Sequence, residues 1–319
     1  MPRRVIPVLA FLLCVSGSEA SILNIVNQVR LDSYTAYLDN KLHAHNGDNR
    51  GFGAAHDAAR TDIYGMFTSF GLTTTLDPFT YSGSTYYNVT AIRPGATNPN
   101  SYVILGAHYD SASNAGADDD ASGVAAVLEA ARVLSNYSFA STLVFVAFDR
   151  EEQGLAGSAA WAGSPLYAGG TIAGMLELDM IAYNPLGALY GSNSAAVYTV
   201  GGIANSASTA LVNAIVNYSG GLSVAYQGST SRSDHASFNS RGPSTLLIES
   251  NWTSNPHYHK VTDSLNTANY IDYGYATLMT RSAVGWMAME ATELPEPGTL
   301  ALMAVGLLLV VIRRTNNRF

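Results

Sequence analysis

The chain has 319 residues, of which 47% are hydrophobic, so it is long enough to bury the core of one large domain. Charged residues make up only 13% of the sequence and the formal net charge is −8, a balance that argues against a nucleic-acid partner, which would require a basic surface. Mild acidity of this kind is an ordinary solubility charge and indicates no particular ligand.

The N-terminus has the pattern of an export signal. A short basic start precedes the apolar run 5–15, and small residues follow up to Ala20. We expect residues 1–20 to be a signal peptide cleaved after Ala20, because the apolar run is too short to span a bilayer. A lipoprotein signal at Cys14 is a weaker interpretation, since Leu13 precedes it. Cys14 is the single cysteine, so the mature chain would have no disulfide and any metal site must use nitrogen and oxygen ligands.

Residues 21–291 show no internal repeat and are expected to form one domain. Apolar residues at helical spacing predict helices at 22–34, 54–70, 123–134, 205–217 and 268–289. Runs of β-branched, aromatic and apolar residues predict strands at 86–92, 102–107, 143–148, 175–178 and 245–248. This alternation predicts an α/β fold, a single domain with a mostly parallel central β-sheet flanked by helices on both faces.

Polar residues directly follow several of the predicted strands. His108 and Asp110 follow the second strand, Glu151 and Glu152 the third, and Asp179 the fourth. Open α/β sheets place their sites beyond these carboxyl ends. A His-x-Asp triplet or a glutamate pair is weak support for a site when taken alone. At the mouth of a buried strand, however, two adjacent carboxylates can serve a metal and a water, the division that a hydrolytic metal site requires.

Two loops add further polar groups. Three consecutive aspartates, 118–120, precede the third predicted helix, where helix capping is the simpler interpretation of them in isolation. His257 and His259 lie in a loop before the last helix, and in isolation they would be ordinary surface residues. Taken together and in this order, these groups favour a metal site.

A series of short motifs resembles the dizinc aminopeptidase family, typified by bacterial leucyl aminopeptidases. The motifs are HYD, GADDDASGVAA, FDREEQGLAGS, LELDM, SDHAS and NPHYH, and the resemblance covers residues 88–265. It implies a zinc-dependent exopeptidase fold with two Zn²⁺ ions, for which Co²⁺ or Mn²⁺ are alternatives. It also implies hydrolysis of N-terminal residues from peptides with a free N-terminus, by a hydroxide that bridges the metals.

The resemblance assigns a role to each metal ligand. Asp119 would bridge both metals, because it occupies the position of the family's bridging carboxylate. Glu152 and His259 would complete the ligand set of one metal, and His108 and Asp179 would complete that of the other.

Other motif residues would act beside the metals. Glu151 would be the general base, and Tyr258, next to a metal ligand, is the candidate donor to the developing oxyanion. His257 stands two positions too early to be the ligand. Asp110 would orient the first histidine ligand, and Asp263 would support the loop that carries the second.

Substrate preference and activity stay partly open. Some relatives carry a cysteine pair in the stretch that corresponds to 228–232, whereas this chain does not. Arg232 could favour acidic substrates or could simply face solvent. A carboxypeptidase-like exopeptidase of other specificity is one alternative. A non-catalytic surface or matrix module is another, although such proteins typically lose ligands that are all present here.

The C-terminal residues 292–319 resemble the bacterial PEP-CTERM sorting signal. Pro-Glu-Pro at 295–297 precedes the apolar run 300–312 and a pair of arginines. As a helix the run would cover about 20 Å, short of the roughly 30 Å hydrocarbon core. The resemblance implies export across the inner membrane of a bacterium to the cell surface, the extracellular matrix or the medium. Signal peptidase and a sorting enzyme would be the processing partners. A plain tail anchor, with the run as a transmembrane helix, is the alternative, and membrane anchoring would be transient or marginal.

Overall fold

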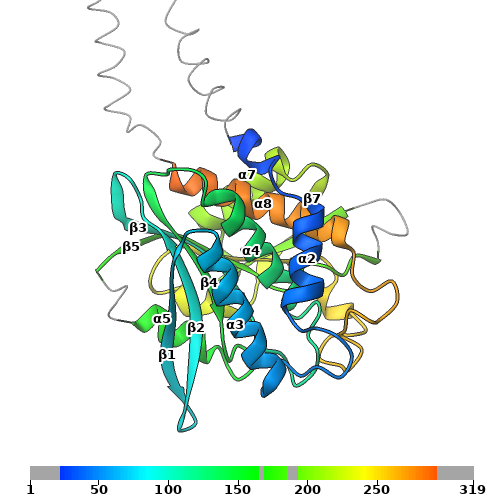
Figure 1. The fold of residues 1–319 in the computed structure, drawn as a ribbon. Coiled ribbons are helices and arrows are strands. Elements are labelled where there is room, and N and C mark those ends of the chain that lie inside the picture. Colours follow the sequence, from blue (N-terminus) through cyan, green and yellow to red (C-terminus); the bar gives the residue numbers. More distant parts are fainter. Residues whose placement is uncertain (1–21, 165–168, 186–192, 293–319) are drawn as a thin grey trace, which may run out of the picture.

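The computed structural model describes residues 22–164, 169–185 and 193–292, which fold around one central β-sheet (Figure 1). The helices include α2 (Leu31–Lys41), α3 (Ala54–Ser69), α4 (Ala121–Leu134), α5 (Ala156–Gly163), α7 (Ser206–Tyr218) and α8 (Tyr273–Ala291). Short 3-10 helices include η1 (Val200–Gly202), η2 (Asp234–Phe238) and η3 (Trp252–Ser254). The strands are β1 (Thr73–Tyr81), β2 (Ser84–Arg93), β3 (Asn98–His108), β4 (Ser141–Phe148), β5 (Thr171–Leu178), β6 (Asn193–Thr199), β7 (Leu222–Ser229) and β8 (Ser244–Glu249).

The described strands form an eight-stranded sheet in the order β1-β2-β4-β3-β5-β8-β6-β7. The central strands β4, β3, β5 and β8 run parallel to one another, while β1, β2 and β6 each pair antiparallel with a neighbour. His108 pairs with Phe148, and Leu178 pairs with Leu247. The carboxyl ends of the central strands therefore meet at one edge of the sheet, where an open α/β sheet carries its site.

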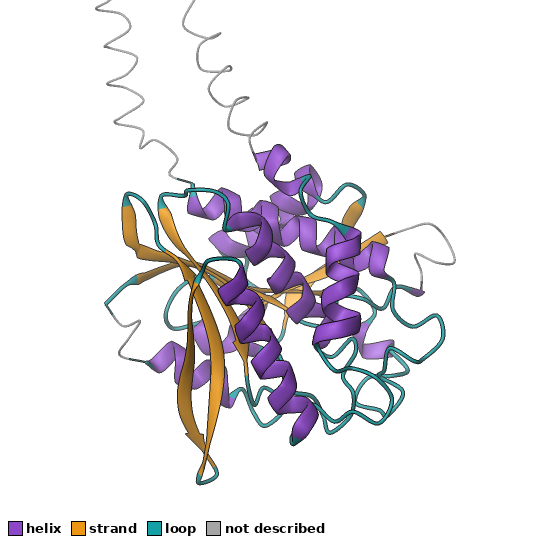
Figure 2. Ribbon diagram, viewed as in Figure 1, coloured by secondary structure: helices purple, strands orange, loops and turns teal. Residues whose placement is uncertain are grey.

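Helices cover both faces of this sheet (Figure 2). On one face, residues of α2, α3, α4, α7 and α8 join a large apolar cluster with strand residues such as Leu105 and Phe145. On the other face, Trp161 of α5 and Phe238 of η2 pack against the alternate strand residues, among them Val146. Every residue of β4 is buried, because side chains of a central strand point into one cluster or the other. The expected single α/β domain with a mostly parallel sheet is confirmed.

The expected helices and strands are present, with two differences at helix starts. The opening helix at 22–34 is instead a short helix at 22–26 and a separate α2. Between them Arg30 adopts an extended conformation, and its N–H donates to Oε1 of Glu129 at 2.7 Å. The last helix begins at Tyr273 rather than 268, because the Asp272 side chain caps it by accepting the N–H of Tyr275 at 2.9 Å.

Three strands were not predicted from the sequence. β1 and β7 are the edge strands of the sheet, and β6 pairs with β7 next to one edge. Edge strands have little buried apolar surface, and β1 is largely exposed and contains Pro78. The alternation that reveals a half-buried strand is therefore weak in β1.

The prediction of a transmembrane helix is wrong for the described part of the chain. No described helix has both the length and the apolar character needed to cross a membrane. The apolar run 300–312, on which that prediction rested, lies outside the described residues.

Candidate metal centre and active site

The predicted ligands come together at the carboxyl edge of the central strands. His108 is the last residue of β3, Glu152 follows β4, and Asp179 follows β5. Asp119 lies in the loop before α4, and His259 lies in the loop between β8 and α8. Residues far apart in the sequence therefore meet because the parallel strands deliver their following loops to one edge.

One carboxylate lies between two imidazoles. Oδ1 of Asp119 is 3.2 Å from Nε2 of His108, and its Oδ2 is 3.2 Å from Nε2 of His259. Oδ1 of Asp179 lies 3.8 Å from the same nitrogen of His108, and Oε2 of Glu152 lies 3.1 Å from that of His259. Two groups of one histidine and two carboxylates thus share Asp119, an arrangement that fits a pair of metal ions.

The donor atoms are also in a state that suits metal binding. Within the described residues, Nε2 of His108, Oδ2 of Asp119 and Oε1 of Glu152 are buried without a hydrogen-bond partner. Nδ1 of His108 lies 3.2 Å from the backbone oxygen of Asp110. A carbonyl oxygen can only accept, so a neutral His108 would carry its proton on Nδ1 and would present the lone pair of Nε2 to a metal ion. The donor set of nitrogen and oxygen atoms fits zinc.

Asp120 also lies close enough to His108 and Asp179 to be a ligand. Its oxygens, however, accept backbone N–H groups from His108 at 3.1 Å, Gly123 at 2.9 Å and Met180 at 3.2 Å. This carboxylate is already satisfied, whereas Asp119 has a buried oxygen without a hydrogen bond. Asp119 is therefore the better candidate ligand, and Asp120 caps α4 and joins the ends of two strands. The peptide bond between the two residues is cis.

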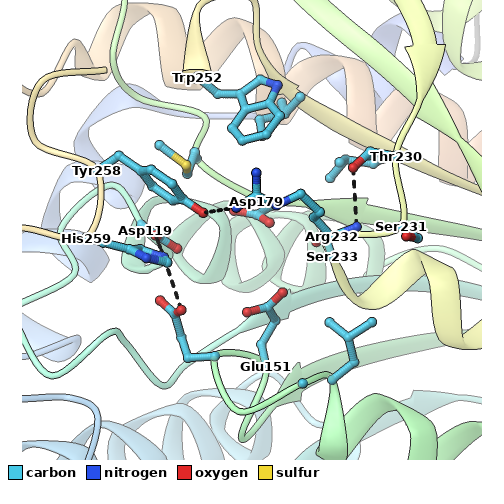
Figure 3. Close-up of a pocket in the computed structure, with 16 residues that line it drawn as sticks. Asp119, Glu151, Asp179, Thr230, Ser231, Arg232, Ser233, Trp252, Tyr258 and His259 are labelled. Atoms are coloured by element: carbon cyan, nitrogen blue, oxygen red, sulfur yellow. Dashed lines mark hydrogen bonds and ion pairs between the residues drawn. The ribbon is translucent and has the colours of Figure 1, made fainter. Parts of the chain in front are cut away.

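Glu151 lines the cavity next to the ligands (Figure 3). Burial raises the pKa of its carboxyl well above the ordinary value. Its N–H donates to Oδ1 of Asp110 at 3.1 Å, and the N–H of Glu152 donates to Oδ2 at 3.3 Å. Oδ1 of Asp110 also lies 3.5 Å from Nδ1 of His108. The Asp110 carboxylate therefore contacts both the histidine and the backbone N–H groups of Glu151 and Glu152.

The loop that carries His259 is tied to the aspartate loop. Both carboxylate oxygens of Asp263 accept backbone N–H groups, from Asp118 at 2.8 Å and from Asp119 at 3.3 Å. The Asn255 side chain donates to Asp118 at 3.1 Å and to Glu249 at 3.1 Å. These bonds connect the two loops that carry the candidate ligands Asp119 and His259, and Asp118 takes part in this connection.

Arg50 is a residue of this site that the sequence analysis missed. Its side chain is buried, and Nη2 donates to the backbone oxygen of Asp110 at 3.3 Å. Burial lowers its pKa, while Asp120, Asp263 and other nearby aspartates act in the opposite direction. Arg50 lies in a loop before α3, where an arginine ordinarily faces solvent, so no local pattern marks it as a buried countercharge.

The two neighbours of the His259 ligand position differ. His257 does not join the metal groups, since its Nδ1 lies 2.9 Å from Oγ1 of Thr262 and its ring packs on Tyr270 at 4.3 Å. Tyr258 lines the cavity, and its ring lies 3.9 Å from that of His259. Burial raises the pKa of the Tyr258 hydroxyl, so it remains a proton donor at neutral pH.

The cavity over these residues has a volume of about 370 Å³. Asp119, Glu151, Glu152, Asp179 and His259 form the polar part of its lining. The rest is lined by apolar and loop residues, which include Met180, Leu246, Ile248, Trp252 and the segment 230–233. This concave site combines a polar centre with an apolar wall, which is typical of a pocket for a small substrate or one residue of a peptide.

Comparisons with known proteins agree with this geometry. The sequence model of peptidase family M28 matches residues 88–284, and the PEP-CTERM protein-sorting motif matches 293–314. Leupeptin-inactivating enzyme 1 of Streptomyces exfoliatus is 38% identical over 208 residues, which are 62% of this chain and 44% of that protein. A probable zinc metalloprotease of Pyrenophora tritici-repentis is 41% identical over 102 residues, 29% of this chain and 24% of that protein. The chain therefore spans less than half the length of these curated relatives.

The solved structures include the LapA aminopeptidase of Legionella pneumophila. It superimposes with a TM-score of 0.72 over 86% of this chain and 75% of that chain, at 21% sequence identity. At this identity the likeness concerns the fold, which agrees with the expected architecture. The family match spans the loops that carry the candidate ligands and most of the central sheet. Over these residues the chain belongs to peptidase family M28.

Proposed function

We propose that the chain is an exported dizinc aminopeptidase that removes N-terminal residues from peptides. The observation that carries this proposal is the position of Asp119, with one carboxylate oxygen facing His108 and the other facing His259. A single carboxylate between two histidine-carboxylate groups is the ligand arrangement that a two-metal hydrolytic site needs.

Two zinc ions would be held by ligands from both groups. The contacts of His108 with Asp119 and Asp179 indicate that these three would hold one ion. Asp119, Glu152 and His259 would hold the other. When bound, zinc lowers the pKa of a water molecule and polarises a carbonyl oxygen.

Glu151 would move the proton in this reaction. Its carboxylate would take a proton from the attacking water and deliver it to the departing amine. Asp110 positions the Glu151 backbone by accepting its N–H, so the base is held beside the ligands. The Tyr258 hydroxyl lines the same cavity and would donate a hydrogen bond to the oxyanion that develops on the scissile carbonyl.

The acidic side of the cavity supports recognition of a free α-amine. Glu151 and Asp179 line it, and carboxylates attract an ammonium group. Arg232, however, also lines the cavity, next to Tyr258, and would suit a substrate carboxylate, which favours a carboxypeptidase as the second candidate. Paired substrates separate the two: an aminopeptidase cleaves leucyl-p-nitroanilide but not its N-acetyl form, whereas a carboxypeptidase cleaves N-blocked dipeptides.

The role of Glu151 is tested with the variants Glu151→Ala and Glu151→Gln. We expect turnover of leucyl-p-nitroanilide to be abolished while the zinc content, measured by mass spectrometry of the metal, stays at that of the parent protein. Chelation should abolish the parent activity, and added zinc should restore it. Activity that survives in Glu151→Ala would refute the assigned role.

Export is proposed from the two ends of the chain. The PEP-CTERM match at 293–314 supports a sorting system as partner. We propose that 1–20 is a signal peptide, 21–291 the catalytic domain and 292–319 the sorting segment. Mass spectrometry of the protein from its native host would test these boundaries. An N-terminus at Met1 on the cytoplasmic protein would contradict them.

A further inference from the structure

Arg232 is a cation at the cavity, and the described residues provide no acidic partner for it. It lines the cavity beside Tyr258 and Trp252 (Figure 3). Nη2 lies 3.5 Å from the Tyr258 hydroxyl, and Cζ lies 5.4 Å from the centre of the Trp252 ring. Among the described residues, no carboxylate forms an ion pair with this exposed guanidinium. The aromatic contacts hold the side chain over the cavity without neutralising its charge.

The cavity therefore has three chemically different parts. The metal ligands and Glu151 form an acidic side, which suits the α-amine and the scissile bond. Met180, Leu246 and Ile248 form an apolar wall, which suits the methylene groups of a side chain. The guanidinium of Arg232 is a third kind of lining group; it lies next to Tyr258 and Trp252, and it can donate parallel hydrogen bonds to a carboxylate.

We propose that Arg232 binds a carboxylate of the substrate and gives the enzyme a preference for an acidic N-terminal residue. This inference rests on the proposed aminopeptidase function, because it places the N-terminal side chain in this cavity. A glutamate side chain matches the site well, since its methylene groups can pack on the apolar wall while its carboxylate meets the guanidinium. The α-carboxylate of a dipeptide carries the same chemistry and is the other possible source.

The test compares substrates that differ only in a carboxylate. Full-length zinc-loaded protein is assayed with glutamyl- and glutaminyl-p-nitroanilide, which have nearly the same size and shape. We expect kcat/KM to be about tenfold higher for the glutamyl substrate, mainly through KM, because a charge-assisted bond to arginine is replaced by a neutral one. Lysyl-p-nitroanilide should be the poorest substrate, since like charges repel.

Variants of Arg232 show whether this residue carries the preference. Arg232→Gln should reduce the glutamyl-to-glutaminyl ratio to about one, and Arg232→Lys should retain part of it, because lysine keeps the charge but not the planar fork. Arg30→Gln is the matched control, since Arg30 is an exposed arginine paired with Asp32 away from the cavity. The control should keep the parent ratio.

A second pair of substrates identifies the source of the carboxylate. If Arg232 binds the α-carboxylate of a dipeptide, leucyl-glycine should be preferred over leucyl-glycinamide, and Arg232→Gln should remove that preference. Either pattern supports carboxylate binding, and the first supports the proposed acidic N-terminal residue. Equal rates within both pairs, or ratios unchanged in Arg232→Gln, would overturn the inference while leaving the aminopeptidase proposal intact.

Binding gives a measurement that does not depend on turnover. Calorimetric titration of the zinc-loaded protein with glutamic acid α-amide and glutamine α-amide should show about tenfold tighter binding of the former, and Arg232→Gln should remove the difference. If glutamic acid α-amide binds more tightly but no substrate is hydrolysed, the aminopeptidase proposal is refuted and the Arg232 site is supported. Equal affinities would refute the Arg232 site.

Discussion

Replacing Asp263 with Asn should weaken metal binding although Asp263 is not a proposed ligand. Its two oxygens accept the N–H groups of Asp118 and Asp119, and its side chain is buried. An asparagine has one acceptor oxygen, so its NH₂ group would face one of these N–H donors. Losing one charged hydrogen bond and leaving a buried donor unpaired costs about 2 kcal/mol. Because Asp119 and His259 are joined through this contact, we expect zinc affinity to decrease about thirtyfold.

Zinc affinity is measured by competition with a chromogenic chelator, and folding is checked by circular dichroism and thermal unfolding. Asp272→Asn is the matched control, because Asp272 accepts the N–H of Tyr275 as a helix cap, a position that asparagine serves about as well. The control should bind zinc like the parent protein. If Asp263→Asn also binds both ions with parent affinity, the coupling between the two ligand loops does not exist as described.

Three further predictions concern stability. Arg50→Met removes the buried guanidinium that lies near Asp120 and other aspartates. In urea, the free energy of unfolding of the zinc-free protein should decrease by about 3–5 kcal/mol. Added zinc should restore part of this stability. Alanine is a better helix former than glycine, yet Gly123→Ala should lower the unfolding temperature, because an added Cβ would lie 2.4 Å from Oδ1 of Asp120. An increase in the unfolding temperature would show that this loop can relax. Burial raises the pKa of Glu290 to about 7. The folded chain thus holds this proton more tightly than the unfolded chain, and stability should decrease as pH increases from 4.5 through 7. Glu290→Gln should stabilise the protein by roughly 1 kcal/mol at pH 8, a value reduced for the partial exposure of the side chain, and should change stability little at pH 4. If the free energy of unfolding in urea depends on pH in the same way in both proteins, this assignment is contradicted.

The sequence by itself determined the α/β class, the central strands and the residues that meet at their ends. These features depend on local patterns, because a fully buried strand such as β4 is apolar throughout and a capped helix such as α4 follows a polar loop. Parallel strands then bring their following loops to one edge whatever the details of packing. The positions of His108 and Asp179 at strand ends could therefore be predicted without the structure.

Only the tertiary structure decided which of several neighbouring polar residues hold the loops together and which face the candidate metal site. Asp118, Asp119 and Asp120 are alike in sequence, but distant N–H groups donate to the oxygens of Asp118 and Asp120, whereas Asp119 keeps a buried oxygen without a hydrogen bond. The burial of Arg50 and the position of Arg232 over the cavity likewise come from contacts between segments far apart in the chain. Such contacts leave no periodic signal in the sequence, because a side chain's burial and charge partners are set by long-range packing rather than by its neighbours along the chain.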